Sequence, residues 1–137
     1  MPDTSTRPSA DRTGQVSAGL LYSLRVVVIA HAAALAVAAS FAGQAVESAP
    51  MSATHAMAGL VVNLVALIQL ILAVLLWRPG RGAGWPAPAS LALLIIGLAQ
   101  HVLSQWLGAH VPTGVVLFGL ITAVLIWAWS PAAARRR

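Results

Sequence analysis

Four histidines are the side chains of this 137-residue sequence best suited to chemistry: His31, His55, His101 and His110. A neutral imidazole is a good ligand for iron, zinc or copper, and it can also hydrogen-bond between helices. No Asp, Glu or Lys lies inside the long apolar segments, and Arg25 lies near the end of one. Proton-coupled transport and voltage sensing, which depend on charges within the membrane, are therefore disfavoured. The sequence has no Cys, which excludes thiolate ligands and disulfides.

Two of the histidines open a repeated pattern, His-x-x-x-Gly. It occurs as His55 with Gly59 and as His110 with Gly114. A residue four positions later lies on the same face of a helix. The repeat is typical of a weak internal duplication of two helical hairpins, in which each pattern opens the second helix of its pair. His31, in the middle of its segment, and His101 fit the repeat less well.

These histidines have two interpretations. A matched pair on two helices of an apolar bundle favours axial ligation of a haem iron, with His55 and His110 as ligands and His31 and His101 as an alternative, deeper pair. The other interpretation is a set of interhelical hydrogen bonds, each worth about 1 kcal/mol or less. Only Glu47 could complete a zinc or copper shell, so such a site ranks lower. The same hydrogen-bonding role is expected of four amides: Asn63, Gln69, Gln100 and Gln105.

The elements that must position these side chains are membrane-spanning helices. The chain is 59% hydrophobic and only 8% charged, with a mean hydropathy of +0.85, whereas soluble domains carry about 25% charged residues. Four segments reach the roughly 20 apolar residues needed to cross a bilayer. They are residues 20–43, 55–77, 87–108 and 111–130. The prediction is an all-α integral membrane four-helix up-down bundle over residues 20–130, with a disordered cytoplasmic arm at 1–19 and a basic cytoplasmic tail at 131–137. Prolines should lie only in loops and at span edges: Pro50, Pro79, Pro86, Pro88, Pro112 and Pro131.

The orientation follows from eight arginines in a chain without Lys. All lie on one side of the predicted bundle: Arg7, Arg12, Arg25, Arg78, Arg81, Arg135, Arg136 and Arg137. By the positive-inside rule both termini and the 78–85 loop are cytoplasmic, and the expected location is the bacterial plasma membrane, in a multi-pass topology. The positions of Trp and Tyr agree with this orientation, because these residues are typical of the two membrane interfaces. The residue expected at the outer interface is Trp106, and those expected at the inner interface are Tyr22, Trp77, Trp85, Trp127 and Trp129. The Arg residues lack interleaved aromatics, so nucleic acid is not an expected partner.

Each of three spans carries a stripe of small and polar residues, predicted to face the bundle interior. Such stripes favour close helix packing or leave room for a flat macrocycle beside a histidine. In order of the spans, the stripes are His31, Ala34, Ala38 and Ala42; His55, Gly59, Val62, Ala66, Gln69 and Ala73; and Ser90, Gly97, His101, Ser104, Gln105 and Gly108.

On these motifs the chain resembles one four-helix half of the haem A synthase family. In that family a His of the second helix, in the motif Glu-x-x-His-Arg-x-x-Gly, and a His of the fourth helix bind haem at the outer side. The resemblance carries over to His55 with Gly59 and to His110. Ser52 and Ala56 stand in place of the Glu and Arg, and there is no second half, so synthase activity is not implied. Over nearly its whole length the chain also resembles small uncharacterised four-helix membrane proteins of high-GC bacteria, a resemblance that implies no function.

The leading functional hypothesis is a small membrane protein that binds b-type haem for electron transfer or haem handling. The alternative is a non-enzymatic accessory subunit that lies in the lipid bilayer without a cofactor and packs against partner helices or a second copy of itself. A small-solute carrier ranks last, because broken helices and intramembrane charges are missing. None of these hypotheses requires catalysis.

Overall fold

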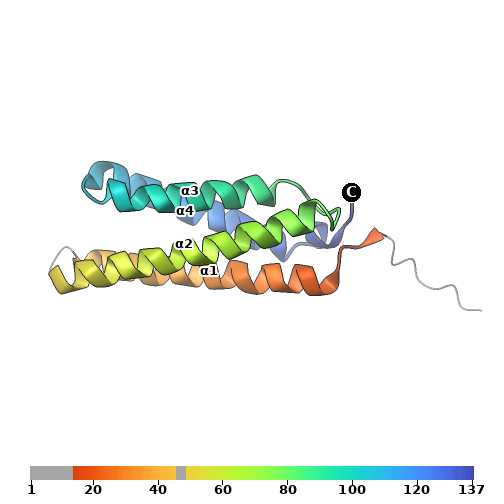
Figure 1. The fold of residues 1–137 in the computed structure, drawn as a ribbon, viewed down its shortest axis with the longest axis horizontal. Coiled ribbons are helices and arrows are strands. Elements are labelled where there is room, and N and C mark those ends of the chain that lie inside the picture. The colour runs from red at the N-terminus through yellow and green to blue at the C-terminus, as the bar shows by residue number, and fades with distance from the viewer. Residues whose placement is uncertain (1–13, 46–48) are drawn as a thin grey trace, which may run out of the picture.

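The protein is all-helical. The computed structural model describes residues 14–45 and 49–137, and its elements are α1 (Ala18–Ala45), α2 (Ala49–Trp77), α3 (Pro86–Leu103), α4 (Leu107–Ala128) and the short 3-10 helix η2 (Pro131–Ala134) (Figure 1). All four α-helices are long and apolar enough to cross a membrane, with the span of α2 starting at Ser52. The prediction of four helices long and apolar enough to span a membrane is confirmed. Residues 1–13 of the predicted arm and Glu47 lie outside the described residues.

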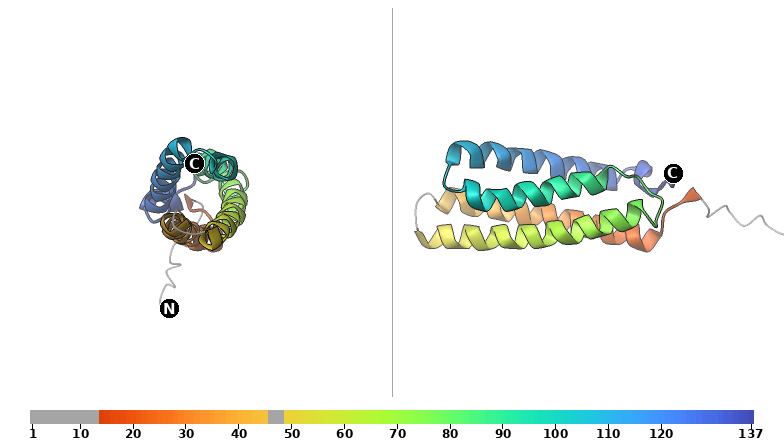
Figure 2. Two further views of the ribbon diagram at one scale, coloured as in Figure 1. Left: turned by 90° about the vertical axis from the view of Figure 1, so that its left-hand side faces the viewer. Right: turned by 45° about the horizontal axis from the view of Figure 1, so that its top comes forward.

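The four α-helices form a ring in chain order. Each helix packs on the next, and α1 closes the ring against α4, whereas the backbones of α1 and α3, and of α2 and α4, lie diagonally opposite each other in the described residues (Figure 2). Apolar side chains at spacings of three and four residues fill the centre, among them Leu24, Val28, Leu93, Ile121 and Val124. The outward faces are also apolar, and many large side chains are exposed, which suits contact with lipid.

The interior stripes agree with prediction on two helices. On α1, His31 and Ala38 are buried and the other two members are partly buried. On α2, all six members are buried or partly buried. On α3 the stripe faces inward only as far as Gly97. Its later members are exposed: His101 lies in the last turn of α3, and Ser104, Gln105 and Gly108 lie beyond the end of that helix.

The α3–α4 turn lies earlier than the sequence predicts. The third span is predicted to run to residue 108, but α3 ends at Leu103. There the Ser104 N–H donates to the Gln100 carbonyl at 2.9 Å, and the Ser104 hydroxyl donates to the His101 carbonyl at 2.8 Å. These bonds occupy the last carbonyls of the helix and let the chain turn. As a result α4 begins at Leu107, and His110 lies in its first turn.

The new start of α4 places Pro112 inside a helix, where the sequence predicts only edge positions. A proline there removes the N–H that would bond to the Gly108 carbonyl. The neighbouring Thr113 hydroxyl instead donates to the carbonyl of Ala109 at 2.7 Å and to that of His110 at 3.0 Å. The helix continues unbroken to Ala128.

One end of the bundle is closed by hydrogen bonds between distant segments. The Val16 N–H donates to the Ala134 carbonyl, and the Arg136 N–H donates to the Gly14 carbonyl. The Arg137 N–H donates to the Arg81 carbonyl in the α2–α3 loop. The disorder predicted for residues 1–19 therefore does not extend to 14–19, because these backbone groups have partners and Val16 is buried. The tail over 131–137 is likewise folded onto the bundle (Figure 1).

Arg81 has the left-handed backbone conformation, with φ of 55°. This conformation brings the Cβ of an L-residue close to its carbonyl oxygen, which costs about 1 to 2 kcal/mol for residues other than Gly. We expect Arg81→Gly to be more stable than Arg81→Ala by about 1 kcal/mol. Both variants remove the same side-chain charge, so the midpoints of their unfolding in SDS can be compared directly. Equal midpoints would contradict the prediction.

Candidate functional site

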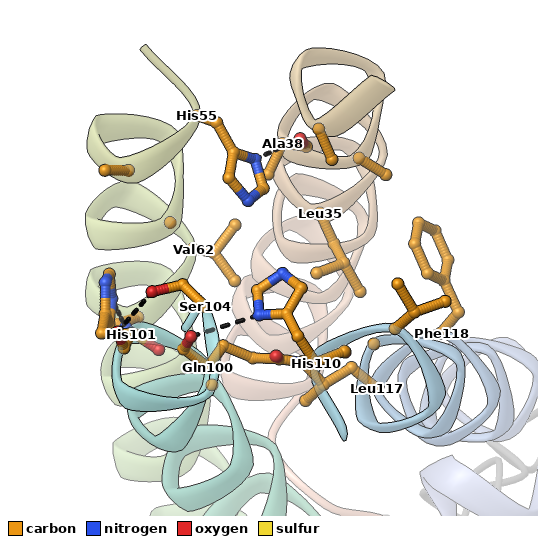
Figure 3. A pocket seen from close by; sticks show the side chains of 18 of the residues that line it. Leu35, Ala38, His55, Val62, Gln100, His101, Ser104, His110, Leu117 and Phe118 are labelled. Atoms are coloured by element: carbon orange, nitrogen blue, oxygen red, sulfur yellow. Dashed lines mark hydrogen bonds between the residues drawn. The ribbon is translucent and has the colours of Figure 1, made fainter. Parts of the chain in front are cut away.

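The end of the bundle near the α3–α4 turn contains a cavity of about 390 Å³. All four helices line it, and the lining includes three of the four histidines: His55, His101 and His110 (Figure 3). Most of the other lining side chains are apolar or small, for example Leu35, Val62, Leu117, Phe118 and Gly97. The cavity is thus an apolar pocket with a few polar groups, as expected of a site for a small molecule or cofactor.

His55 and His110 face each other across this pocket. Their ring centres are 5.9 Å apart, and their planes make an angle of 72°. His55 Nδ1 lies 2.8 Å from the Ala38 carbonyl, and His110 Nδ1 lies 3.2 Å from the Gln100 carbonyl. A carbonyl oxygen can only accept, so each Nδ1 carries the proton. In the neutral rings each Nε2 then has a free lone pair, and Figure 3 shows these two nitrogens turned toward one another.

Residues around each imidazole hold it in this orientation. Ala38, on the buried face of α1, has a small side chain that lets His55 of α2 reach its carbonyl. The His110 bond is reciprocal, because the Gln100 side-chain amide donates to the His110 carbonyl at 3.2 Å while the Gln100 carbonyl accepts from the ring. A second hydrogen bond of this kind is what fixes the tautomer and the orientation of a ligating histidine.

His101 points away from this pair, toward α2. Its Nε2 lies 2.9 Å from Asn63 Nδ2, so the amide donates and the ring nitrogen accepts. The ring also packs on Gly59, where a Cβ would lie only 3.2 Å from the imidazole carbon Cε1. The Nε2 lone pair of His101 therefore already accepts a hydrogen bond. This makes His101 a weaker candidate for a metal ligand than His55 or His110.

The two glycines of the repeated His-x-x-x-Gly pattern both face side chains of α3, and only Gly59 is tightly packed. In α2, Gly59 leaves space for His101 of α3. In α4, a Cβ at Gly114 would lie 3.6 Å from the Gln100 amide, also on α3. Two consecutive residues of α3 thus reach the two neighbouring helices. Each glycine receives one of them, one turn beyond the histidine that faces the pocket.

His31 lies outside the cavity lining, in a buried hydrogen-bonded chain across three helices. Its Nδ1 donates to Gln69 Oε1 at 2.8 Å, and Gln69 Nε2 donates to the Ser90 hydroxyl at 2.9 Å. All three side chains are at most 1% exposed. Because His31 bonds Gln69 and His101 bonds Asn63, these two histidines do not form the deeper pair of ligands that the sequence offers as an alternative. Gln69, Asn63 and Gln100 do link helices, as predicted.

Two buried acceptors of the described lining have no hydrogen-bond partner. They are Asn63 Oδ1 and Gln100 Oε1. The sequence identifies both amides but not their place beside the pocket. It also gives no signal for the carbonyls of Ala38 and Gln100, because every residue carries a carbonyl and only packing selects these two. A helical projection could have identified Leu35 and Phe118 as apolar lining.

Gly97 is needed for the close approach of α2 and α3. A Cβ at this position would overlap Asn63 Oδ1, and Asn63 is 8% exposed with little room to move. We expect Gly97→Ala to lower the free energy of unfolding by about 1.5 kcal/mol, the range of core overpacking. Unfolding in SDS measures this loss. Gly119→Ala is the control, because a Cβ there has no atom within 4 Å. The prediction fails if the two variants unfold alike.

Within residues 14–45 and 49–137, no group of three or more His, Cys, Asp or Glu side chains could hold a metal ion. Among these residues, the pocket brings the rings of His55 and His110 close together. No protein-family model, curated protein or solved structure matches this chain.

Proposed function

We propose that this protein is a small multi-pass membrane protein that binds a b-type haem between His55 and His110, for electron transfer or haem handling. The observation that carries the proposal is the arrangement of the two imidazoles. Each has its Nδ1–H bonded to a backbone carbonyl and its Nε2 turned toward the other ring. This is the tautomer and the supporting hydrogen bond of a histidine that ligates a metal.

The distance between the rings of His55 and His110 also supports ligation of one metal ion. A bond between a metal and an imidazole nitrogen is about 2 Å, so two histidines on opposite sides of one ion place their ring centres about 6 Å apart. The observed separation is 5.9 Å. A haem iron takes two axial ligands from opposite sides of its macrocycle, whereas a structural zinc site needs four ligands. Two imidazoles without a third or fourth described ligand therefore favour haem over zinc.

The rest of the pocket suits a flat apolar ring. Leu35, Val62, Leu117 and Phe118 supply apolar surface, and the alanines and glycines among the lining residues leave open volume. The cavity volume of about 390 Å³ lies within the range of ligand pockets, about 300 to 1,000 Å³.

The chemistry follows from the ligand set. Haem supplies one-electron redox chemistry, and axial histidines are among the ligands that tune it. His55 and His110 would both be used in holding the group, so neither side chain would be free to act on a substrate. The chain's own side chains then orient the group and exclude water, which suits electron transfer or haem transfer better than catalysis.

The proposed topology is an up-down bundle with both termini in the cytoplasm of a bacterial cell. The support is the distribution of arginine: the chain's eight lie before α1, near its first residues, in the 78–85 loop or after α4. The histidine pocket is at the end near the α3–α4 turn, which has none. The haem would accordingly lie near the outer surface of the membrane.

The direct test is an absorption spectrum of the purified full-length protein, recorded with and without dithionite, before and after addition of haemin. We expect a Soret band with a reduced-minus-oxidised difference and a stoichiometry of one haem per chain. A protein that stays colourless, with unbound haemin after titration, would contradict the proposal. The accessory-subunit interpretation would then stand.

A further inference from the structure

The end of the bundle opposite the histidine pocket contains a second cavity, of about 400 Å³. Its lining includes the indoles of Trp85 and Trp127 and the three consecutive arginines 135–137. Nothing in the haem proposal uses this cavity. Its residues come from the α2–α3 loop, the last turn of α4 and the tail that follows it.

Main-chain bonds hold the arginines in place. Gln15 and Arg135 form an antiparallel bridge, and the N–H groups of Arg136 and Arg137 donate to the carbonyls of Gly14 and Arg81 at 2.9 and 2.8 Å. The tail is thus folded back and not free in solvent. A folded backbone restricts where the guanidinium groups can go, so their positive charge is concentrated beside one cavity.

The three arginines give this cavity a positive charge. Two cationic side chains beside one cavity, Arg135 and Arg137, favour the binding of an anion there. A guanidinium group matches the oxygens of a phosphate with two parallel hydrogen bonds.

The aromatic wall indicates where the anion comes from. Trp85 and Trp127 pack edge to face, with ring centres 5.5 Å apart. Tryptophan is typical of the boundary between lipid headgroups and acyl chains, because its ring is apolar and its N–H is polar. Close by, Arg25 donates to the Ala128 carbonyl and lies over the Trp129 ring, 4.9 Å from its centre. This end of the bundle therefore has the composition of a membrane interface.

We propose that the cavity between Trp85, Trp127 and the arginine tail is a binding site for the phosphate headgroup of an anionic phospholipid. Arg135 and Arg137 bind the phosphate, and the indoles contact the glycerol and the first part of the acyl chains. Exposed apolar side chains on the neighbouring helices then continue the surface along which the chains lie. Basic pockets at helix ends on the cytoplasmic side commonly bind such headgroups.

The test compares two double variants that remove equal charge from the same end of the protein. Arg135→Gln with Arg137→Gln removes two cations at the cavity. The control, Arg78→Gln with Arg81→Gln, removes two that do not line it, and the Arg78 guanidinium instead lies over Trp77. Full-length protein in phosphatidylcholine nanodiscs is titrated with short-chain phosphatidylglycerol, and bound lipid is counted by native mass spectrometry.

We expect phosphatidylglycerol to bind in preference to phosphatidylcholine, and the Arg135/Arg137 variant to bind it about thirtyfold more weakly, given the contribution of each cationic side chain near an anionic headgroup. The Arg78/Arg81 variant should lose much less affinity for phosphatidylglycerol. An equal loss in both variants would show that only diffuse charge matters and would overturn the proposal. A parallel titration with inorganic phosphate identifies the source of the anion, and phosphate binding as tightly as the lipid would also overturn it. None of these outcomes changes the expected haem absorbance, so the lipid proposal and the haem proposal are tested separately.

Discussion

Replacement of either His55 or His110 by Ala is expected to abolish the Soret band of the haem-loaded protein. Each imidazole supplies one of the two proposed axial ligands, and the described cavity offers no third side chain in an equivalent position. Loss of one ligand leaves the iron bound on one side only, so haem should be lost on purification. The measurement is the absorbance of the reduced Soret band, normalised to protein, for each single variant.

Two controls and a rescue make this result specific. His101→Ala should keep the band, because the Nε2 of His101 is bonded to Asn63. His31→Ala should also keep it, because His31 lies outside the cavity and bonds Gln69. Added imidazole should restore the band in His55→Ala and His110→Ala, which distinguishes a missing ligand from a misfolded protein. Loss of the band only in His31→Ala and His101→Ala would move the site to that pair and contradict the assignment.

Gln69→Leu is expected to lower the free energy of unfolding by about 2 to 3 kcal/mol. Gln69 is fully buried, accepts from His31 and donates to Ser90, so the variant leaves two polar side chains buried without partners. An unsatisfied buried group costs about 1 to 3 kcal/mol in proteins, although bonds between membrane helices average nearer 0.6 kcal/mol. The midpoint of unfolding in SDS measures the effect.

The triple variant Gln69→Leu with His31→Leu and Ser90→Ala supplies the matched comparison. It removes every member of the buried chain, so no polar group is left unsatisfied, and an apolar replacement of similar shape can be nearly neutral. We expect it to recover more than half of the stability lost by Gln69→Leu. If the triple variant is the least stable of the set, the hydrogen bonds themselves stabilise the bundle, and the account based on unsatisfied groups is wrong.

The sequence alone determined the number of helices and the environment in which they fold. The length and hydropathy of an apolar segment are local properties, and a helix must satisfy its own backbone wherever lipid surrounds it. The faces of α1 and α2 that turn inward could also be predicted from helical periodicity. It places His31 and Ala38 on one face of α1, and Gln69 and Ala73 on one face of α2. The buried positions of these residues confirm this.

Only the tertiary structure decided which histidines share a pocket and where α3 ends. Periodicity assigns a residue to a face and a depth of its own helix, but rotation and neighbours depend on packing. The packing of α3 sends Gln100 toward His110 and His101 toward Asn63, and the turn at Ser104 moves His110 into the first turn of α4. The carbonyls that orient His55 and His110 belong to Ala38 and Gln100, and no sequence pattern distinguishes one backbone carbonyl from another.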